Sequence, residues 1–300
     1  MGDAVSALLS VPGFLTNEPV CVALAVGGGA ALVCAVVGCA TVMRRQSFAG
    51  HALADVSSAG GSAAYLLAVN PLFGFLGMAA AAAGVMEWAD IREARERDLL
   101  TGVVLGAGLG LAALLLYFDA TVRSVSGAAV TVLFGSMFTI PASIVPLALA
   151  VAAVALAASA IIYRPLLVSS LSADLARAQG IRVRAVALTH ALALALAVSL
   201  SAMTVGAILS TALLIGPAAA ALRLAKRPAS AVVFAALIGL GATWGGIVLA
   251  YESFYWTPGH GWPVSFFIVA LIFCAYLIAG WRAGRAGVRR APHPSGCEGA

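Results

Sequence analysis

The sequence predicts an all-α fold, a polytopic bundle of membrane-spanning helices, and three observations support this prediction. Hydrophobic residues make up 62% of the 300-residue chain and charged residues only 10%, whereas soluble domains carry roughly 25% charged residues. Nine apolar runs each approach the roughly 20 residues that a spanning helix needs. Sixteen of the seventeen basic residues are arginines, and they fall in short segments between those runs. We therefore expect a multi-pass protein of the plasma membrane.

Nine segments are predicted to cross the membrane as helices. They cover residues 20–42, 48–69, 71–88, 99–118, 142–163, 185–203, 205–222, 229–250 and 263–281. The stretch 127–140 is also apolar, but it is short and Pro141 ends it, so we expect a half-helix or interfacial segment there. In the fourth run Gly102, Gly106 and Gly110 repeat every four residues, a spacing typical of close helix contacts.

The basic residues also predict the orientation of the chain. With nine spans and the N-terminus outside, sixteen basic residues lie in inner segments and Arg123 alone lies outside, and an excess of Arg and Lys marks the cytoplasmic side. We expect residues 1–18 to form an extracytoplasmic segment, 19–281 the transmembrane permease domain and 282–300 a cytoplasmic tail. The net charge of +5 is thus a topology signal, and we expect contact with membrane lipid but no nucleic-acid partner.

The sequence lacks the motifs of an ATPase or a hydrolase. A P-loop requires a lysine followed by Ser or Thr to hold phosphates, but the only lysine, Lys226, stands between Ala225 and Arg227. Neither an HExxH motif nor a GxSxG motif occurs. We therefore expect a protein that is not an enzyme and binds no permanent cofactor.

Two ionisable residues lie four positions apart inside the second apolar run, His51 and Asp55. A charge inside a spanning helix costs about 2.5–3.5 kcal/mol on insertion scales, so it is usually functional or paired. The i, i+4 spacing puts both side chains on one helix face, and an imidazole nitrogen with a carboxylate oxygen suits Zn²⁺ or Mn²⁺. A His–Asp hydrogen bond that only fixes helix packing is the alternative, and spacing does not choose between them.

Three further ionisable residues, Asp119, Glu252 and His260, are predicted at the outer mouth. Acidic groups there could attract a cation, although exposed loop charges are common. Glu252 is the candidate for a further metal ligand.

The segment 169–183 is the longest polar interruption of the apolar array. Ser172 can cap a short helix and Gly180 can end it. By the distribution of charge this helix lies on the cytoplasmic face, so it is a candidate for docking a partner through Ser172, Asp174, Ala176 and Gly180. An inert interfacial helix is the alternative.

A second notable segment is the seventh apolar run with its basic end, residues 204–227. Gly216 and Pro217 are expected to interrupt the helix there, because Pro217 cannot donate to the carbonyl one turn earlier. Such breaks are tolerated where they face protein or a cavity, so this site is either a gate in a pathway or a packed kink.

Six segments match, in order, the motifs of one protein family. They are RRQSFAGHALADVSSAGG (44–61), DLLTGVVLG (98–106), LFGSM (133–137), SADLARAQGIRV (172–183), VGAILSTALLIGPAAAALRLAKR (205–227) and TPGHGWPVSF (257–266). The first resembles R-R-x-S-x-x-G-D-A-x-S-H-x-x-x-x-G, and the fifth V-G-x-L-L-x-x-A-L-L-I-x-P-A-A-x-A. Together they resemble the membrane-spanning permease subunits of zinc/manganese-type ABC importers.

This resemblance implies an all-helical permease that works as a pair, most simply a homodimer. It also implies energy from a separate cytoplasmic ATPase and delivery of a divalent metal by an extracytoplasmic substrate-binding protein. The chain departs from the family pattern at two places. The family has Asp first and His four residues later, whereas this chain has His51 before Asp55, and Ser136 replaces the acid that follows L-F-G.

The leading interpretation is therefore a permease that imports zinc or manganese. A divergent permease for a non-metal or surface-protein-linked cargo is the first alternative, and a non-transporting membrane scaffold is the second. A channel or secondary transporter that works without an ATPase is the third, and the predicted docking element at 169–183 disfavours it.

Overall fold

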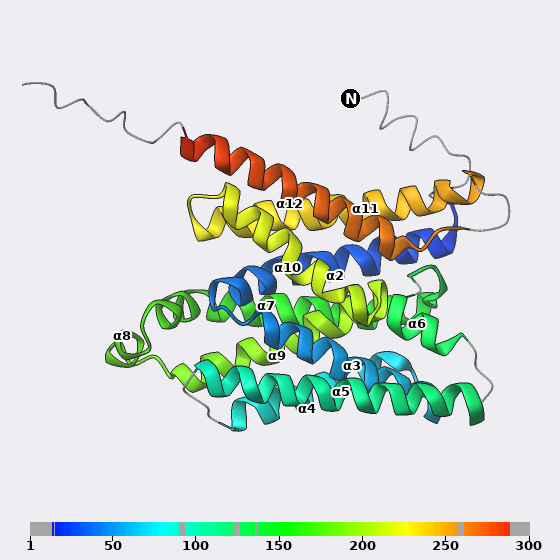
Figure 1. Cartoon of the computed structure of the whole chain (residues 1–300), viewed down its shortest axis with the longest axis horizontal. Coiled ribbons are helices and arrows are strands. Elements are labelled where there is room, and N and C mark those ends of the chain that lie inside the picture. The colour runs from blue at the N-terminus through cyan, green and yellow to red at the C-terminus, as the bar shows by residue number, and fades with distance from the viewer. Residues whose placement is uncertain are drawn as a thin grey trace, which may run out of the picture.

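The computed structural model describes residues 14, 16–89, 94–122, 127–135, 137–256 and 261–288, and every regular element among them is a helix (Figure 1). Nine are long: α2 (Glu18–Met43), α3 (Ser47–Leu67), α4 (Pro71–Trp88), α5 (Ala94–Val122), α7 (Val145–Leu171), α9 (Val183–Val205), α10 (Ala207–Leu224), α11 (Pro228–Trp256) and α12 (Val264–Val288). The short ones are α6 (Ala128–Phe134), α8 (Ala173–Ala178), η1 (Met137–Thr139) and η2 (Ala142–Ile144). Each predicted span coincides with one long helix, which confirms the all-α fold.

Eight of the helices in the described part of the chain are long and apolar enough to cross a membrane, and α3 is not among them. The reason is composition, since α3 is 21 residues long but contains a histidine, an aspartate and four serines. Much of α3 is buried within the protein, where polar groups can be satisfied by neighbouring helices. The nine crossings and the orientation stay predictions.

The orientation can be tested with a reporter fused after Arg290. The positive-inside rule predicts that this end of the chain is cytoplasmic, so the fusion should show full cytoplasmic reporter activity. A reporter inserted beside Arg123 should give the opposite result. An extracytoplasmic signal after Arg290 would contradict the predicted topology.

Helix α2 lies at the centre of the bundle, where it packs against α7, α9, α10 and α11 (Figure 1). On one side of it α10, α11 and α12 pack on one another, and on the other side α3 packs against α4, α5, α9 and α10. The core is built largely from alanine, valine and glycine, and these small side chains let helix backbones approach closely.

The glycine ridge predicted in the fourth run does not make the expected contact. A Cβ atom added to Gly106 or Gly110 would meet no described atom within 4 Å, whereas one on Gly108 would lie 2.5 Å from Val56 Cγ2. The close packing of α5 on α3 therefore depends on Gly108, which lies off the predicted ridge.

Segment 127–140 does not span, as predicted, because α6 has only seven residues and η1 follows it. The end of α6 crosses the junction of α9 and α10 at two glycines. Gly135 has φ +75° and Gly206 has φ +95°, and a Cβ atom on Gly206 would lie 2.4 Å from the carbonyl oxygen of Leu133. Only glycine fits such a crossing.

The helix interruption predicted at Gly216 and Pro217 is absent, because α10 continues through both residues. The break in this region lies instead at Gly206, between α9 and α10. Because Gly216 has no side chain, α12 can pack closely on α10 at this position, where a Cβ atom would lie 2.3 Å from Ile272 Cγ2. Pro217 is buried and lies near Gly239 of α11, so a neighbouring helix covers the position where the proline removes a backbone donor.

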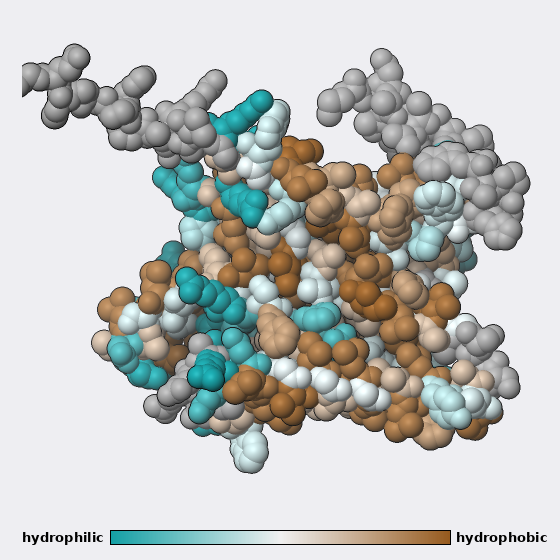
Figure 2. All heavy atoms as spheres, viewed as in Figure 1, coloured by the Kyte–Doolittle hydropathy of each residue, from teal (hydrophilic) through white to brown (hydrophobic). Residues whose placement is uncertain are grey.

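The surface agrees with a membrane protein. In Figure 2 hydrophobic residues cover much of the visible sides of the bundle, and hydrophilic residues gather toward the end where α8 lies. Phenylalanine, leucine, valine and tryptophan side chains are exposed along α5, α7, α11 and α12. This apolar exposure is what contact with lipid requires.

Candidate metal-binding site

His51 and Asp55 both lie in the first half of α3, and close helix crossings fix this helix in place. A Cβ atom on Gly60 would lie 2.1 Å from the carbonyl oxygen of Gly74 in α4, and one on Gly50 would lie 2.7 Å from Leu214 Cδ2 in α10. The absence of side chains at Gly60 and Gly50 therefore lets α3 pack closely against α4 and α10, and this packing sets where its two ionisable side chains lie.

The two side chains face each other but do not share a hydrogen bond. His51 Nε2 lies 3.7 Å from Asp55 Oδ2, which is beyond hydrogen-bond distance. The side chain of Asp55 is 6% exposed and that of His51 is 41% exposed. The carboxylate is therefore buried at the base of the site, and the imidazole lies at its rim.

The hydrogen bond of His51 goes instead to α10. Its Nδ1 atom lies 3.0 Å from Thr211 Oγ1, and this contact fixes the ring orientation so that Nε2 points toward Asp55. Metal-binding histidines usually have such a partner on the second ring nitrogen. Sequence reasoning missed Thr211, because one neutral hydroxyl in an apolar run is an ordinary feature.

Asp55 Oδ2 is buried and has no hydrogen-bond partner among the described residues. A buried carboxylate oxygen without a partner is costly, and such an atom calls for an explanation such as an ion. The structural alternative, a direct His–Asp hydrogen bond that pins the helix, is not the arrangement found here. The donor set of one imidazole nitrogen and one carboxylate oxygen fits a divalent transition metal.

The structure does not join Glu252 to this pair. Glu252 lies near the end of α11, which packs against α2, α10 and α12 rather than on α3. Among the described residues, no three His, Cys, Asp or Glu side chains lie close enough together to hold a metal ion. Glu252 therefore does not complete the ligand set of His51 and Asp55 within a single copy of the chain, and its role as a separate cation-attracting group at the outer mouth stays a prediction.

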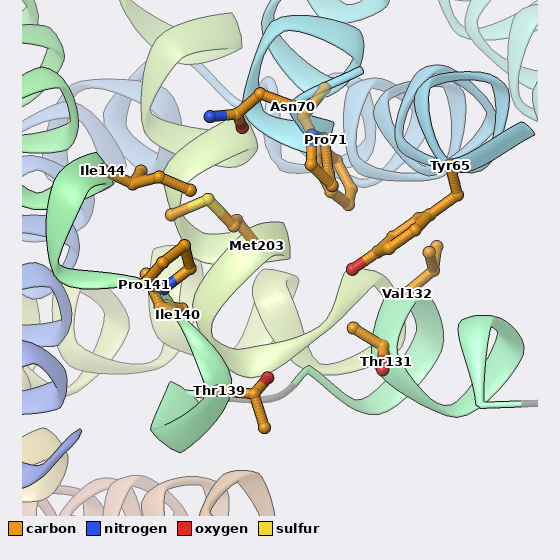
Figure 3. Close-up of a pocket in the computed structure, with 11 residues that line it drawn as sticks. Tyr65, Asn70, Pro71, Thr131, Val132, Thr139, Ile140, Pro141, Ile144 and Met203 are labelled. Atoms are coloured by element: carbon orange, nitrogen blue, oxygen red, sulfur yellow. The ribbon is translucent and has the colours of Figure 1, made fainter. Parts of the chain in front are cut away.

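The other residues predicted at the outer mouth are separate as well. Asp119 is buried near the end of α5, and His260 lies outside the described residues. A cavity of about 190 Å³ lies between the α3–α4 corner and α6 to η2 (Figure 3). Its polar groups belong to Tyr65, Asn70, Thr131 and Thr139, so its lining holds no carboxylate to neutralise a divalent cation.

The short helix that the sequence predicts within residues 169–183 is present as α8. Ser172 is its N-cap, and its hydroxyl accepts a hydrogen bond from the Leu175 N–H at 3.2 Å. Gly180 has φ +75° and its N–H bonds to the carbonyl of Arg177, while Ile181 N–H bonds to that of Ala176, which is the Schellman pattern. These findings confirm the predicted cap and end of the helix.

The two faces of α8 have different surroundings. Ala176 is fully buried against its own chain, so its side chain packs within the protein, and its part in docking stays a prediction. Leu175 is 50% exposed, and Asp174 forms an exposed ion pair with Arg177 at 2.8 Å. A partner would therefore meet the face that carries Asp174, Leu175 and Arg177.

Comparisons with known proteins agree with this architecture. The chain is 25% identical over 248 residues to a manganese transport system membrane protein, MntC, of Listeria monocytogenes, covering 83% of this chain and 86% of the relative. It is 29% identical over 235 residues to a high-affinity zinc uptake system membrane protein, ZnuB, of Haemophilus influenzae, covering 78% and 87%.

A solved structure titled PsaBC from Streptococcus pneumoniae in complex with Fab has the same fold, with a TM-score of 0.77 at 24% identity, covering 92% of this chain and 95% of that one. The model of the ABC 3 transport family matches residues 17–281, which is nearly the whole described region. The chain therefore belongs to the ABC 3 transport family and is a multi-pass protein of the plasma membrane.

Proposed function

We propose that this chain is the permease subunit of an ABC importer for a divalent transition metal, zinc or manganese. A cytoplasmic ATPase would supply the energy and an extracytoplasmic substrate-binding protein would deliver the ion. Family membership and relatives named for manganese and zinc transport support this proposal. The absence of a P-loop lysine from the sequence is consistent with ATP hydrolysis on another subunit.

The observation that carries the proposal is the buried Asp55 oxygen without a hydrogen-bond partner, 3.7 Å from the imidazole nitrogen of His51. A cation between these atoms would compensate the buried carboxylate and take the imidazole Nε2 as a second ligand. The reversed order of the two ligand types leaves both on one face of α3, because the spacing of four residues is kept.

Two ligands do not satisfy a tetrahedral or octahedral ion, so the site needs further ligands. The partly exposed His51 side chain leaves the site open at the surface of the single chain. A second copy related by a two-fold axis would present its own His51 and Asp55 and double the ligand set. Metal titration of the purified complex should then give one ion per two permease copies, and one ion per copy would contradict this pairing.

Zinc and manganese both accept imidazole and carboxylate ligands, so the ligand types are compatible with either ion. Uptake of radioactive zinc and manganese by cells that lack their own importers tests the function. Uptake should require the co-expressed ATPase, and an ATPase variant that cannot hydrolyse ATP is the matched control. Uptake that continues with the inactive ATPase would instead support a channel or secondary transporter, and no uptake of either ion would support another cargo or a scaffold.

The docking role of α8 predicts a second result. Leu175→Asp should lower uptake at least about tenfold, because it puts a charge into an apolar contact that becomes desolvated on docking. The variant should still accumulate in the membrane, since Leu175 is exposed. Co-purification of the ATPase and uptake are the measurements.

Gln179→Asp is the matched control, because it adds the same charge at the exposed C-cap of the same helix. Ala176→Pro tests the helix itself, since proline removes the N–H that bonds to the Ser172 carbonyl at 3.1 Å. Normal coupling of ATP hydrolysis to uptake in both Leu175→Asp and Ala176→Pro would rule out α8 as the docking element.

A further inference from the structure

The corner between α2 and α3 is joined to the segment that precedes α8 by one side chain. Arg44, the C-cap residue of α2, is half-buried. Its Nη1 donates a hydrogen bond to Ser169 Oγ at 3.3 Å, and its Nε donates to Gln46 Oε1 at 3.3 Å. Ser169 lies three residues before the N-cap of α8, and Gln46 is the N-cap residue of α3. Arg44 thus bridges the end of α7 and the start of α3.

An apolar contact joins the same two regions independently. Ile162 and Leu166 of α7 and Val186 of α9 form a small buried cluster, and Ala40 of α2 and Ile181 pack against it. Ile181 is the residue whose N–H closes the last turn of α8. The C-terminal end of α8 is therefore held against the inner end of α2, one turn before Arg44.

The corner itself is short and stiff. Arg45 has φ +58°, a left-handed backbone conformation that is uncommon for residues other than glycine. The N–H groups of Arg44, Arg45 and Gln46 all bond to carbonyls in the last turn of α2. Helix α3 starts at the next residue, and His51 follows four residues later, about 6 Å along the axis. A displacement of Arg44 is therefore carried into α3 rather than absorbed by a loop.

Charges from two other helices act on the same guanidinium. Burial lowers the pKa of Arg44, Glu87 in α4 acts in the opposite direction, and Arg97 in α5 lowers this pKa further. The guanidinium is therefore close enough to α4 and α5 to respond to both. These two helices are direct neighbours of α3.

We propose that Arg44 is the positioning residue that passes movement of α8 to α3, and so to His51 and Asp55. This inference rests on the proposed function to the extent that an ATPase acts on α8. A guanidinium suits the role because its planar donors point in fixed directions toward two acceptors. A lysine in its place would keep the charge but not the fixed geometry.

The first test measures metal ions taken up per ATP hydrolysed by the reconstituted complex. Arg44→Gln should lower this ratio about tenfold, the scale of one charge-assisted hydrogen bond, while the ATPase rate stays near that of the wild type. Arg44→Lys and Ser169→Ala should lower it as well. Arg45→Asn is the matched control, because it removes an equal charge from the exposed neighbour and asparagine tolerates the left-handed conformation.

The second test needs no metal. Hydrogen–deuterium exchange of the complex, with and without a non-hydrolysable ATP analogue, should change in the wild type at both α8 and residues 44–51. In Arg44→Gln the change should stay confined to α8. A wild-type response that omits residues 44–51, or an Arg44→Gln response equal to the wild type, would overturn the proposal. Failure of metal uptake by the wild type would refute the metal cargo alone, because this readout does not depend on it.

Discussion

Replacing Asp55 with asparagine is expected to lower metal uptake about a hundredfold or more, since changes merely beside metal ligands already cost up to that factor. Asparagine has nearly the same shape as aspartate, so it preserves the packing of the buried side chain in α3. It removes the negative charge that would bind the cation. The protein should therefore reach the membrane in normal amounts while uptake, measured with radioactive zinc and manganese, is lost.

The alanine variants separate binding from packing. If His51 and Asp55 are ligands, His51→Ala and Asp55→Ala should each abolish uptake with little loss of expression. If the pair only stabilises the helix, both alanine variants should be unstable and Asp55→Asn nearly normal. Uptake by Asp55→Asn at the wild-type rate would thus remove the pair from the metal path and shift attention to Asp119, Glu252 and His260, the residues predicted at the outer mouth.

Exchanging the two side chains tests the reversed order directly. The double variant His51→Asp with Asp55→His restores the order that the resembled family has, and it should retain part of the uptake that each single alanine variant loses. The exchange places a carboxylate beside Thr211 and an imidazole at the buried position. Uptake no better than in the single variants would show that the geometry is specific to the present order.

The positions of the long helices could be predicted because each needs a run of apolar residues of fixed length. Their ends were less predictable, since helices continue past the apolar run into polar turns. The fourth span, expected over 99–118, is part of α5, which extends from Ala94 to Val122. Hydrophobicity predicts which residues face lipid, but it does not predict the residue at which the backbone hydrogen bonding of a helix ends.

The glycines show that a residue pattern along one helix does not reveal which neighbouring helix packs against it. A repeat of four marks one face of a helix, but the partner that covers a face is set by the whole bundle. The predicted ridge therefore missed Gly108, the residue that contacts Val56. The helix break was misplaced for a related reason: Pro217 is covered by a neighbouring helix and tolerated, whereas Gly206 adopts a positive φ that the sequence does not reveal.

The candidate site was predicted in part. His51 and Asp55 could be found because ionisable residues are rare in spanning helices. Thr211 and Ser169 could not, since their importance depends on partners 160 and 125 residues away in the chain. Long-range pairs of this kind involve ordinary polar residues, and only the packing of α3 against α10 and of the α2–α3 corner against α7 makes them specific.

The crossing of α6 over the α9–α10 junction gives a prediction about stability with a large effect. Gly206→Ala should lower the free energy of unfolding by more than ~3 kcal/mol. Losses this large arise where a substitution strains the backbone or overpacks the core. A Cβ atom there would lie 2.4 Å from Leu133 O and 2.5 Å from Gly135 N, and φ is +95°. Both neighbours are backbone atoms, so no side-chain rotation relieves the contact.

Gly77→Ala is the matched control for Gly206→Ala, because a Cβ atom on Gly77 would meet no described atom within 4 Å and the residue lies inside α4. Alanine in a helix interior is favoured over glycine by roughly 0.5–1 kcal/mol, so this variant should be as stable as the wild type or more so. Thermal unfolding in detergent and the amount of protein in the membrane measure both variants. Equal stability of Gly206→Ala and Gly77→Ala would mean that α6 does not press on the α9–α10 junction, and the backbone crossing described above would be wrong.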